Sequence, residues 1–182
     1  MSRDFYKQDT LKVARELLGC FLVRAIGDET VRARIVETEA YVGEDDLACH
    51  ASKGRTKRTE IMYGEAGHAY IYLVYGMYHC LNIVTERKGF PAAVLIRAVE
   101  IEDVSFKQTN GPGKLCRFLS IDRMLNGADM TSAEGVWIEK GVHIPDADVM
   151  AHPRIGIDYA KHCKDYPWRF VLRSLAKNSR IV

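Results

Sequence analysis

A long alternating segment at residues 31–41 constrains the fold more than any other feature. Its first half, Val31-Arg32-Ala33-Arg34-Ile35, has the period of two that indicates a half-buried β-strand. Strict alternation then places Glu37, Glu39 and Tyr41 on the apolar face. Carboxylates in a core-facing row are unfavourable unless they are paired or line a cavity. Either the strand has left the core there, or it carries a general base to the mouth of a pocket.

A second strand-like run carries one charge among apolar side chains. The segment Ala92-Ala93-Val94-Leu95-Ile96-Arg97-Ala98-Val99 is interrupted only by Arg97. A buried guanidinium stays protonated and needs a carboxylate or several carbonyls as partners. We expect Glu39 or Glu37 to be that partner. The pair is either a structural ion pair or a device that orients a catalytic carboxylate or its water.

An unusual concentration of tyrosines marks residues 70–78. Gly76 predicts a tight turn between two strands, which places Tyr75 at the tip of a β-hairpin. Such tips usually carry Asn, Asp or Gly. Core packing explains most strand tyrosines, whereas Tyr75 is better explained as a wedge inserted into a stack of bases. Further along, Asn82 is polar on an apolar strand and needs a partner or a ligand.

Two segments have weak anion-binding character. Asn110-Gly111-Pro112-Gly113-Lys114 opens a predicted helix with free backbone amides and a lysine. It is not a P-loop, because the upstream glycine is absent and Leu115 replaces the Ser or Thr. Residues 53–58 read Lys-Gly-Arg-Thr-Lys-Arg. That run is usually a solvated loop, and it becomes a phosphate-contact candidate only beside a nucleic-acid site.

Composition sets the broad class. A chain of 182 residues with 47% hydrophobic and 27% charged residues suits one domain, expected over residues 1–182. Net charge is only +2, so bulk electrostatics do not predict a nucleic-acid binder. No apolar run is long enough to cross a bilayer and the N terminus lacks a signal-peptide core, so we expect a cytoplasmic protein. The five cysteines form no C-x-x-C pair, which predicts neither disulfides nor a metal site.

The predicted elements form a mixed α/β (α+β) domain with a curved, mostly antiparallel sheet, flanking helices and a protruding hairpin. A long functional loop, with at most one short helix, is expected over residues 42–68. Helices are expected over residues 10–18 and 112–121. Strands are expected over residues 20–24, 30–41, 69–74, 77–85, 92–99, 136–138 and 168–172.

Taken together, these residues resemble one family, the alkyladenine (3-methyladenine) DNA glycosylases of the methylpurine type. The resemblance runs from Leu17 to Phe170. Residues 101–109 and 123–135 match little, and the extension seen in some members is missing at the N terminus. The strongest blocks are Ile35-Val36-Glu37-Thr38-Glu39-Ala40-Tyr41, Tyr75-Gly76-Met77-Tyr78, Leu95-Ile96-Arg97-Ala98-Val99-Glu100 and Asn110-Gly111-Pro112-Gly113-Lys114-Leu115.

The resemblance implies a role for each matching residue. Glu39 matches the general base that activates water, and Arg97 matches the arginine that helps to hold that water. Asn82 matches the residue that excludes guanine, and Tyr75 matches the tyrosine that fills the gap left by the base. Tyr41, His50 and Tyr72 match the walls of the base pocket. The DNA backbone is expected to meet Arg55, Lys57, Arg58 and Lys114.

The implied protein is a monomeric, monofunctional DNA glycosylase of base excision repair that needs no cofactor or metal. Its partner is double-stranded DNA with alkylated or deaminated purines of the 3-methyladenine, hypoxanthine and ethenoadenine class, and its place is the cytoplasm, at the nucleoid. Two alternatives are considered. A nucleoside hydrolase would need Glu39 and the aromatic pocket without Tyr75 or the basic run. A non-catalytic nucleic-acid-binding module would need the aromatics and charges without the Glu39–Arg97 pair.

Overall fold

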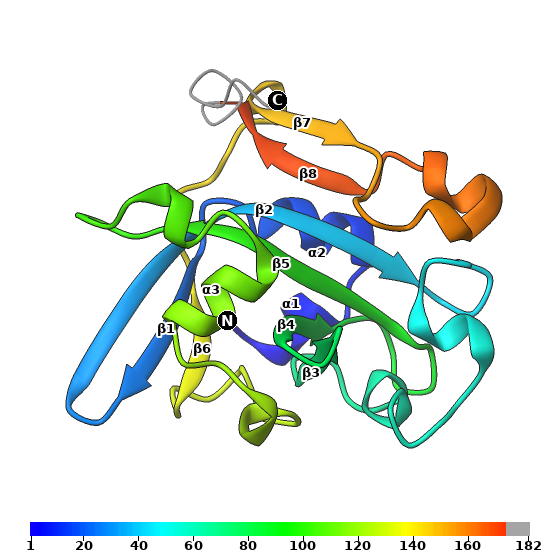
Figure 1. Cartoon of the computed structure of the whole chain (residues 1–182), viewed down its shortest axis with the longest axis horizontal. Coiled ribbons are helices and arrows are strands. Elements are labelled where there is room, and N and C mark those ends of the chain that lie inside the picture. The colour runs from blue at the N-terminus through cyan, green and yellow to red at the C-terminus, as the bar shows by residue number, and fades with distance from the viewer. Residues whose placement is uncertain (174–182) are drawn as a thin grey trace.

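The sheet is built around one long strand, β2 (Glu29–Val42). In this computed structural model, which describes residues 1–173, β5 (Ala92–Glu100) pairs with one edge of β2 (Figure 1). The other edge of β2 pairs with two strands in turn. β1 (Phe21–Ile26) pairs with β2 up to Arg34, and β8 (Arg169–Leu172) pairs with β2 from Glu37 onward. Residues 174–182 of the domain expected over the whole chain lie outside the described part.

All strand pairs within residues 1–173 are antiparallel, and the order β3-β4-β5-β2-β1-β6 is extended by β8 and β7. The remaining strands are β3 (Ala69–Val74), β4 (Tyr78–Val84), β6 (Val136–Glu139) and β7 (Val149–His152). An open antiparallel sheet with a few helices is therefore present, as the sequence predicted. The strand β7 was not predicted.

The predicted face of the acidic residues was wrong, because the β2–β5 register shifts. Val36 of β2 has no partner on β5, which shifts the register by one residue. Arg97 of β5 then has no partner on β2, and the original register is restored at Thr38. Ile35 and Val36 are both buried in the core, and Thr38 then donates a hydrogen bond to the Ala14 carbonyl oxygen at 2.8 Å. The extra residue reverses the alternation. Consequently the side chains of residues 37, 39 and 41 lie on the face opposite the core.

Two short helices pack on the sheet. Helix α2 (Thr10–Glu16) packs against β2 and β5, and the Asp9 side chain caps it by accepting from the Lys12 amide at 3.0 Å. Helix α3 (Pro112–Phe118) packs against β4 and β5. A Cβ at Gly113 would lie 2.9 Å from the Tyr78 Cβ, so this glycine permits the close approach of α3 to the hairpin.

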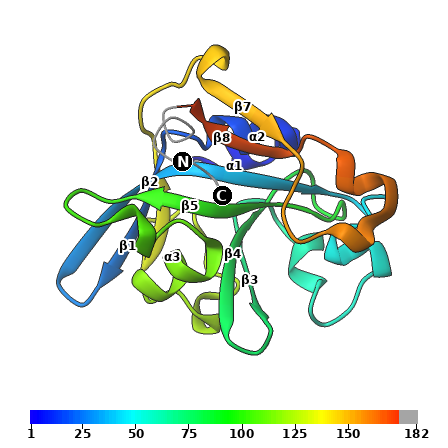
Figure 2. The ribbon, with the colours of Figure 1, turned by 45° about the horizontal axis from the view of Figure 1, so that its top comes forward.

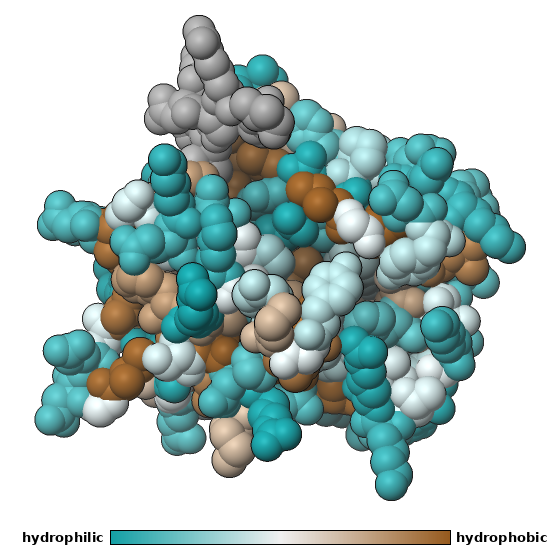
Figure 3. Space-filling model, viewed as in Figure 1, coloured by the Kyte–Doolittle hydropathy of each residue, from teal (hydrophilic) through white to brown (hydrophobic). Residues whose placement is uncertain are grey.

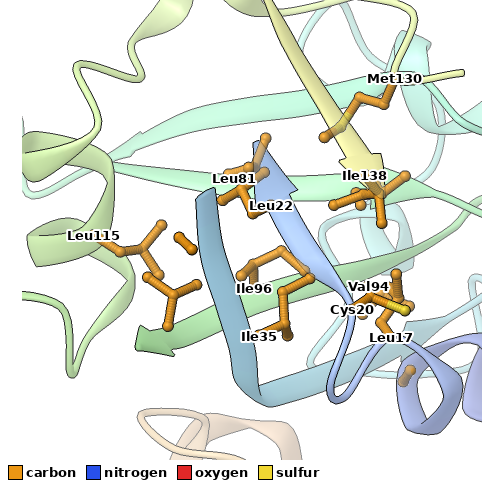
Figure 4. Close-up of a cluster of buried hydrophobic side chains, with 14 of the residues drawn as sticks. Leu17, Cys20, Leu22, Ile35, Leu81, Val94, Ile96, Leu115, Met130 and Ile138 are labelled. Carbon is orange, nitrogen blue, oxygen red and sulfur yellow. The ribbon is translucent and has the colours of Figure 1, made fainter. Parts of the chain in front are cut away.

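Besides two smaller buried clusters, around Tyr70 and around Ala160, the domain has one large apolar core. Side chains from the sheet, α2 and α3 converge in it (Figure 4), and its labelled members are Leu17, Cys20, Leu22, Ile35, Leu81, Val94, Ile96, Leu115, Met130 and Ile138. On the face seen in Figure 3, apolar side chains appear as separate small patches among hydrophilic ones. No helix within residues 1–173 is long and apolar enough to span a bilayer.

The β3–β4 hairpin projects from the body of the domain, beside α3 (Figure 2). The other segments are short. The loop at 42–68 holds two 3-10 helices, where at most one short helix was predicted. Helix α1 and the four 3-10 helices beyond residue 100 were not predicted. Their bounds are α1 (Arg3–Tyr6), η1 (His50–Lys53), η2 (Glu60–Tyr63), η3 (Phe106–Gln108), η4 (Arg123–Leu125), η5 (Asp146–Asp148) and η6 (Asp158–Asp165).

Candidate active site

A cleft of about 730 Å³ lies on the face of the sheet opposite α2. It is bounded by β2, β5, the β3–β4 hairpin, the start of α3 and residues 155–157. Nine of the site residues predicted from the sequence line it: Glu39, Tyr41, His50, Arg58, Tyr72, Tyr75, Asn82, Arg97 and Lys114. Arg55 and Lys57 are not part of its lining.

Glu39 is fully buried at the inner end of this cleft, and both of its oxygens are held. Oε1 accepts from the backbone amide of Ile155 at 2.9 Å and lies 3.3 Å from Arg97 Nη1. Oε2 accepts from the Tyr41 hydroxyl at 2.7 Å. Burial raises the pKa of Tyr41 well above its ordinary value, so this hydroxyl keeps its proton and donates. Three donors therefore compensate the burial of the carboxylate.

Arg97 bridges the two acids of β2, as the isolated charge on β5 predicted. Its Nε lies 3.2 Å from Glu37 Oε1, and its Nη1 faces Glu39. Glu37 is also paired with Arg169 Nη1 at 2.9 Å, which the sequence analysis did not identify. Glu37 is thus paired with two arginines and does not line the cleft, whereas Glu39 is the carboxylate that faces the cleft.

Aromatic rings form the walls. His50 and Tyr72 meet edge to face with their ring centres 4.5 Å apart, and the Tyr70 hydroxyl lies 2.8 Å from His50 Nδ1. Burial, helped by Arg58 and Lys53, lowers the pKa of His50 to about 4. The imidazole is therefore neutral at neutral pH, and this wall does not repel a cationic ring.

Asn82 lies deep in the cleft and is almost fully buried. Its side-chain nitrogen donates to the carbonyl oxygens of Tyr70 at 3.1 Å and Cys80 at 3.3 Å. The partner predicted for this polar side chain is therefore the backbone of its own hairpin. These two bonds fix the position of the amide beside any group that enters the cleft.

Tyr75 occupies the hairpin tip, with 87% of the residue exposed. Its φ is +51° and that of Gly76 is +69°, the left-handed conformations of a tight hairpin turn. This conformation is unfavourable by about 1–2 kcal/mol for a residue with a side chain. An exposed ring on a backbone in an unfavourable conformation buries little surface within the domain, which favours a function outside it.

The basic residues differ in their contacts and in whether they line the cleft. Arg55 makes two hydrogen bonds to the carboxylate of Glu60, at 2.8 and 2.6 Å. Arg58 lies over the Tyr72 ring, 5.2 Å from its centre, at the cleft. Lys114 Nζ is 2.8 Å from the Asn110 side-chain oxygen at the start of α3. Arg55 is thus engaged within its own loop, unlike Arg58 and Lys114, which border the cleft.

Residues 155–157 and Tyr159 complete the cleft, and sequence reasoning missed them. They supply the Ile155 amide to Glu39 and the side chain of Tyr159, which lines the rim. A backbone donor leaves no trace in residue type, and this irregular segment has no hydrophobic period. In the described part of the chain, His, Cys, Asp and Glu residues do not gather in groups that could hold a metal ion.

A buried carboxylate held by an arginine, at the inner end of an aromatic-walled cleft, suits an enzyme that hydrolyses a bond to a flat heterocycle. Beside that cleft lies the exposed Tyr75, the ring that the sequence analysis predicted to enter a stack of bases. This combination defines the class of the DNA N-glycosylases.

Comparison with known proteins agrees with this class. The profile of the family described as methylpurine-DNA glycosylase (MPG) matches residues 4–176. Relatives provisionally named 3-methyladenine DNA glycosylase include one from Methanocella arvoryzae, 51% identical over 93% of this chain and 90% of the relative. Another, from Legionella pneumophila, is 48% identical over 95% of this chain and 94% of the relative. The chain belongs to the methylpurine-DNA glycosylase family and is a DNA repair hydrolase that cleaves N-glycosyl bonds.

Proposed function

We propose that this glycosylase takes alkylated and deaminated purines, of the 3-methyladenine, hypoxanthine and ethenoadenine class, out of double-stranded DNA. It hydrolyses their bond to the sugar with a water activated by Glu39 and leaves an abasic site. The observation that carries the proposal is the burial of Glu39 among Arg97, Tyr41 and Ile155 inside an aromatic-walled cleft.

The target nucleotide must first leave the stack, because the glycosidic bond is inaccessible inside the duplex. Extrusion costs a few kcal/mol. Tyr75, on the projecting hairpin, offsets part of this cost by stacking in the gap that the base leaves. The extruded base then enters the cleft between Tyr41, His50 and Tyr72.

Cleavage needs a carboxylate that is ionised and held in place. The water oxygen attacks C1′ while Glu39 accepts its proton, and the electron pair of the C1′–N bond leaves with the base. The negative charge of Glu39 also stabilises the cationic sugar of the transition state, and Arg97 positions the carboxylate and its water. Because water is the nucleophile, the product strand stays intact at the abasic site, which makes the enzyme monofunctional.

Recognition rests on charge as well as shape. A methylated purine such as 3-methyladenine is cationic, and a cation over an aromatic face gains about 0.5–2 kcal/mol. Neutral His50 adds no repulsion to this contact. A neutral base such as hypoxanthine lacks this gain and is a poorer leaving group, and so its excision depends more on Glu39 and Tyr75.

The protein is proposed to act as a cytoplasmic monomer at the nucleoid. Phosphate contacts are assigned to Arg55, Lys57, Arg58 and Lys114, of which Arg55 would have to exchange its bonds to Glu60 for phosphate oxygens.

Salt dependence tests these contacts. Duplex affinity should fall steeply with ionic strength, and each of Lys57→Ala and Lys114→Ala should reduce the log–log slope by about 0.9. Lys12→Ala, on α2 and away from the cleft, is the matched control and should leave the slope unchanged. Affinity measured by fluorescence anisotropy between 50 and 200 mM salt decides the point. Equal slopes for all three variants would remove these residues from the interface.

Asn82 is proposed to exclude guanine, which differs from hypoxanthine only by a 2-amino group. The fixed amide occupies the space that this amino group needs, and a clash rejects a base more effectively than a missing attraction. Asn82→Ser should therefore gain measurable excision of mispaired guanine and retain activity on hypoxanthine. Excision of both bases in one duplex context is the measurement. A variant that removes hypoxanthine and still leaves guanine untouched would show that Asn82 has only a structural role.

A substrate panel tests the proposed specificity. Duplexes with one 3-methyladenine, hypoxanthine or ethenoadenine should yield abasic sites, and matched duplexes with adenine or guanine should not. Abasic sites are read by alkali cleavage of an end-labelled strand. Excision confined to damaged pyrimidines, or to free nucleosides, would reject the proposal.

A further inference from the structure

A buried arginine outside the cleft lining is tied to both sides of the catalytic carboxylate. The side chain of Arg154 is fully buried, and its two terminal nitrogens contact the carboxylate of Asp46 at 2.5 and 2.8 Å. The same nitrogens donate to the carbonyl oxygens of Ala40 at 2.9 Å and Cys163 at 3.2 Å. One guanidinium therefore joins β2, the loop after β2 and η6.

These contacts form a closed loop of covalent bonds and hydrogen bonds that contains Glu39. Ala40 is the residue after Glu39, and its carbonyl accepts from Arg154. Ile155 is the residue after Arg154, and its amide donates to Glu39 Oε1 at 2.9 Å. The distance between donor and carboxylate is thus set by one short loop of covalent and hydrogen bonds. Moving the Arg154 backbone would move the Ile155 amide with it.

Arg154 also contacts Tyr41, the residue whose hydroxyl donates to the second oxygen of Glu39. The guanidinium lies between two rings, 4.8 Å from the centre of Tyr41 and 5.0 Å from that of Trp168. Tyr41 lines the cleft and donates its hydroxyl to Glu39 Oε2, whereas Arg154 is not part of the lining. The cation therefore supports this aromatic wall without forming part of the cleft surface.

We propose that Arg154, paired with Asp46, is a positioning residue for excision: it holds the Ile155 amide and the Tyr41 hydroxyl on the two oxygens of Glu39. The inference rests on the proposed role of Glu39 as the base. Asp46 completes the arrangement, because its oxygens also accept from the amides of Val42 at 3.2 Å and Ala48 at 3.1 Å. The pair thereby fixes the start of the loop that leads to His50.

The chemistry of the side chain explains why an arginine is needed. Only a planar fork of donors can serve a bidentate carboxylate and two carbonyls in one plane while stacking between rings. An apolar group could fill the same volume and often stabilises a fold as well as a buried ion pair does. An arginine that serves only as a brace would therefore be replaceable without loss of rate in the folded variant, and a positioning arginine would not.

A double-mutant cycle with Glu39 tests the proposal. In the wild-type background, Arg154→Lys should lower single-turnover excision of cationic 3-methyladenine by about 10- to 100-fold, as a misplacement near 1 Å does. In the Glu39→Gln background it should lower the residual rate by less than about twofold, because the group it positions is gone. Affinity for a duplex with a tetrahydrofuran abasic analogue should stay within about twofold.

Arg3→Lys is the matched control, because Arg3 also joins an aspartate, Asp129, and a carbonyl, Ala66, but lies away from the cleft. It should lower the unfolding temperature and leave the rate unchanged. If Arg154→Lys does not fold, isosteric Asp46→Asn enters the same cycle with the same expectation. An equal loss in both Glu39 backgrounds, or none in either, would overturn the inference while the proposed function stands. An inactive wild-type enzyme would reject both.

Discussion

Replacing Glu39 with Gln is expected to lower single-turnover excision of hypoxanthine by about 10²–10⁴ while binding of the damaged duplex survives. Gln keeps the shape of the side chain and can still accept from the Ile155 amide or the Tyr41 hydroxyl. It cannot take a proton from water, and it carries no negative charge to stabilise the cationic sugar. The loss should be smaller for cationic 3-methyladenine, because that base leaves with less help.

Glu37→Gln is the control that separates the two acids of β2. Glu37 contacts Arg97 and Arg169 and does not line the cleft, so its replacement should weaken the support of Arg97 and lower the rate only modestly. Rates measured under single turnover at saturating enzyme isolate the chemical step. A near-normal rate for Glu39→Gln with a large loss for Glu37→Gln would transfer the role of base to Glu37.

Tyr75→Ala should reduce excision from duplex DNA by about 5- to 150-fold, since stacking of one base on an aromatic side chain is worth about 1–3 kcal/mol. The loss should be much smaller in a flexible single strand or opposite a gap, where no stack has to be opened. Tyr75→Phe keeps the ring and should keep most of the duplex activity. Equal losses on all three substrates would mean that Tyr75 supports only the hairpin.

The hairpin and its tip were predictable because they follow from local chemistry. Gly76 fixes the turn, and the tyrosines on either side have a strong preference for strands. The pairing of Arg97 was predictable for a related reason, because a lone charge in an apolar strand has to find a carboxylate. These signals depend on residue type and near neighbours alone.

The face to which Glu39 points was not predictable in the same way. The register shifts by one residue at Val36 and returns at Arg97, and neither position carries a Gly or Pro that would mark a bulge. At this point, between Arg34 and Glu37, the other edge of β2 stops pairing with β1 and starts pairing with β8. Tertiary pairing therefore set the face, and simple alternation failed where the functional residues begin.

Contributions from the C-terminal third were invisible for another reason. Arg154 reaches Ala40, and the Ile155 amide reaches Glu39, at the end of β2 where β8 pairs with that strand across more than a hundred residues of sequence. The sequence around them has no hydrophobic period, and nothing in it distinguishes an arginine that will be buried from one that will be exposed. Only the folded chain brings the aspartate, the arginine and the two aromatic rings together.

Product analysis tests whether water activated by Glu39 releases a damaged purine and leaves the strand intact. A duplex with one hypoxanthine, labelled at one strand end, is incubated with excess enzyme, and free base and strand length are measured together. We expect stoichiometric free hypoxanthine and a strand that breaks only after alkali treatment. Strand cleavage without alkali, or no free base from wild-type enzyme, would contradict it.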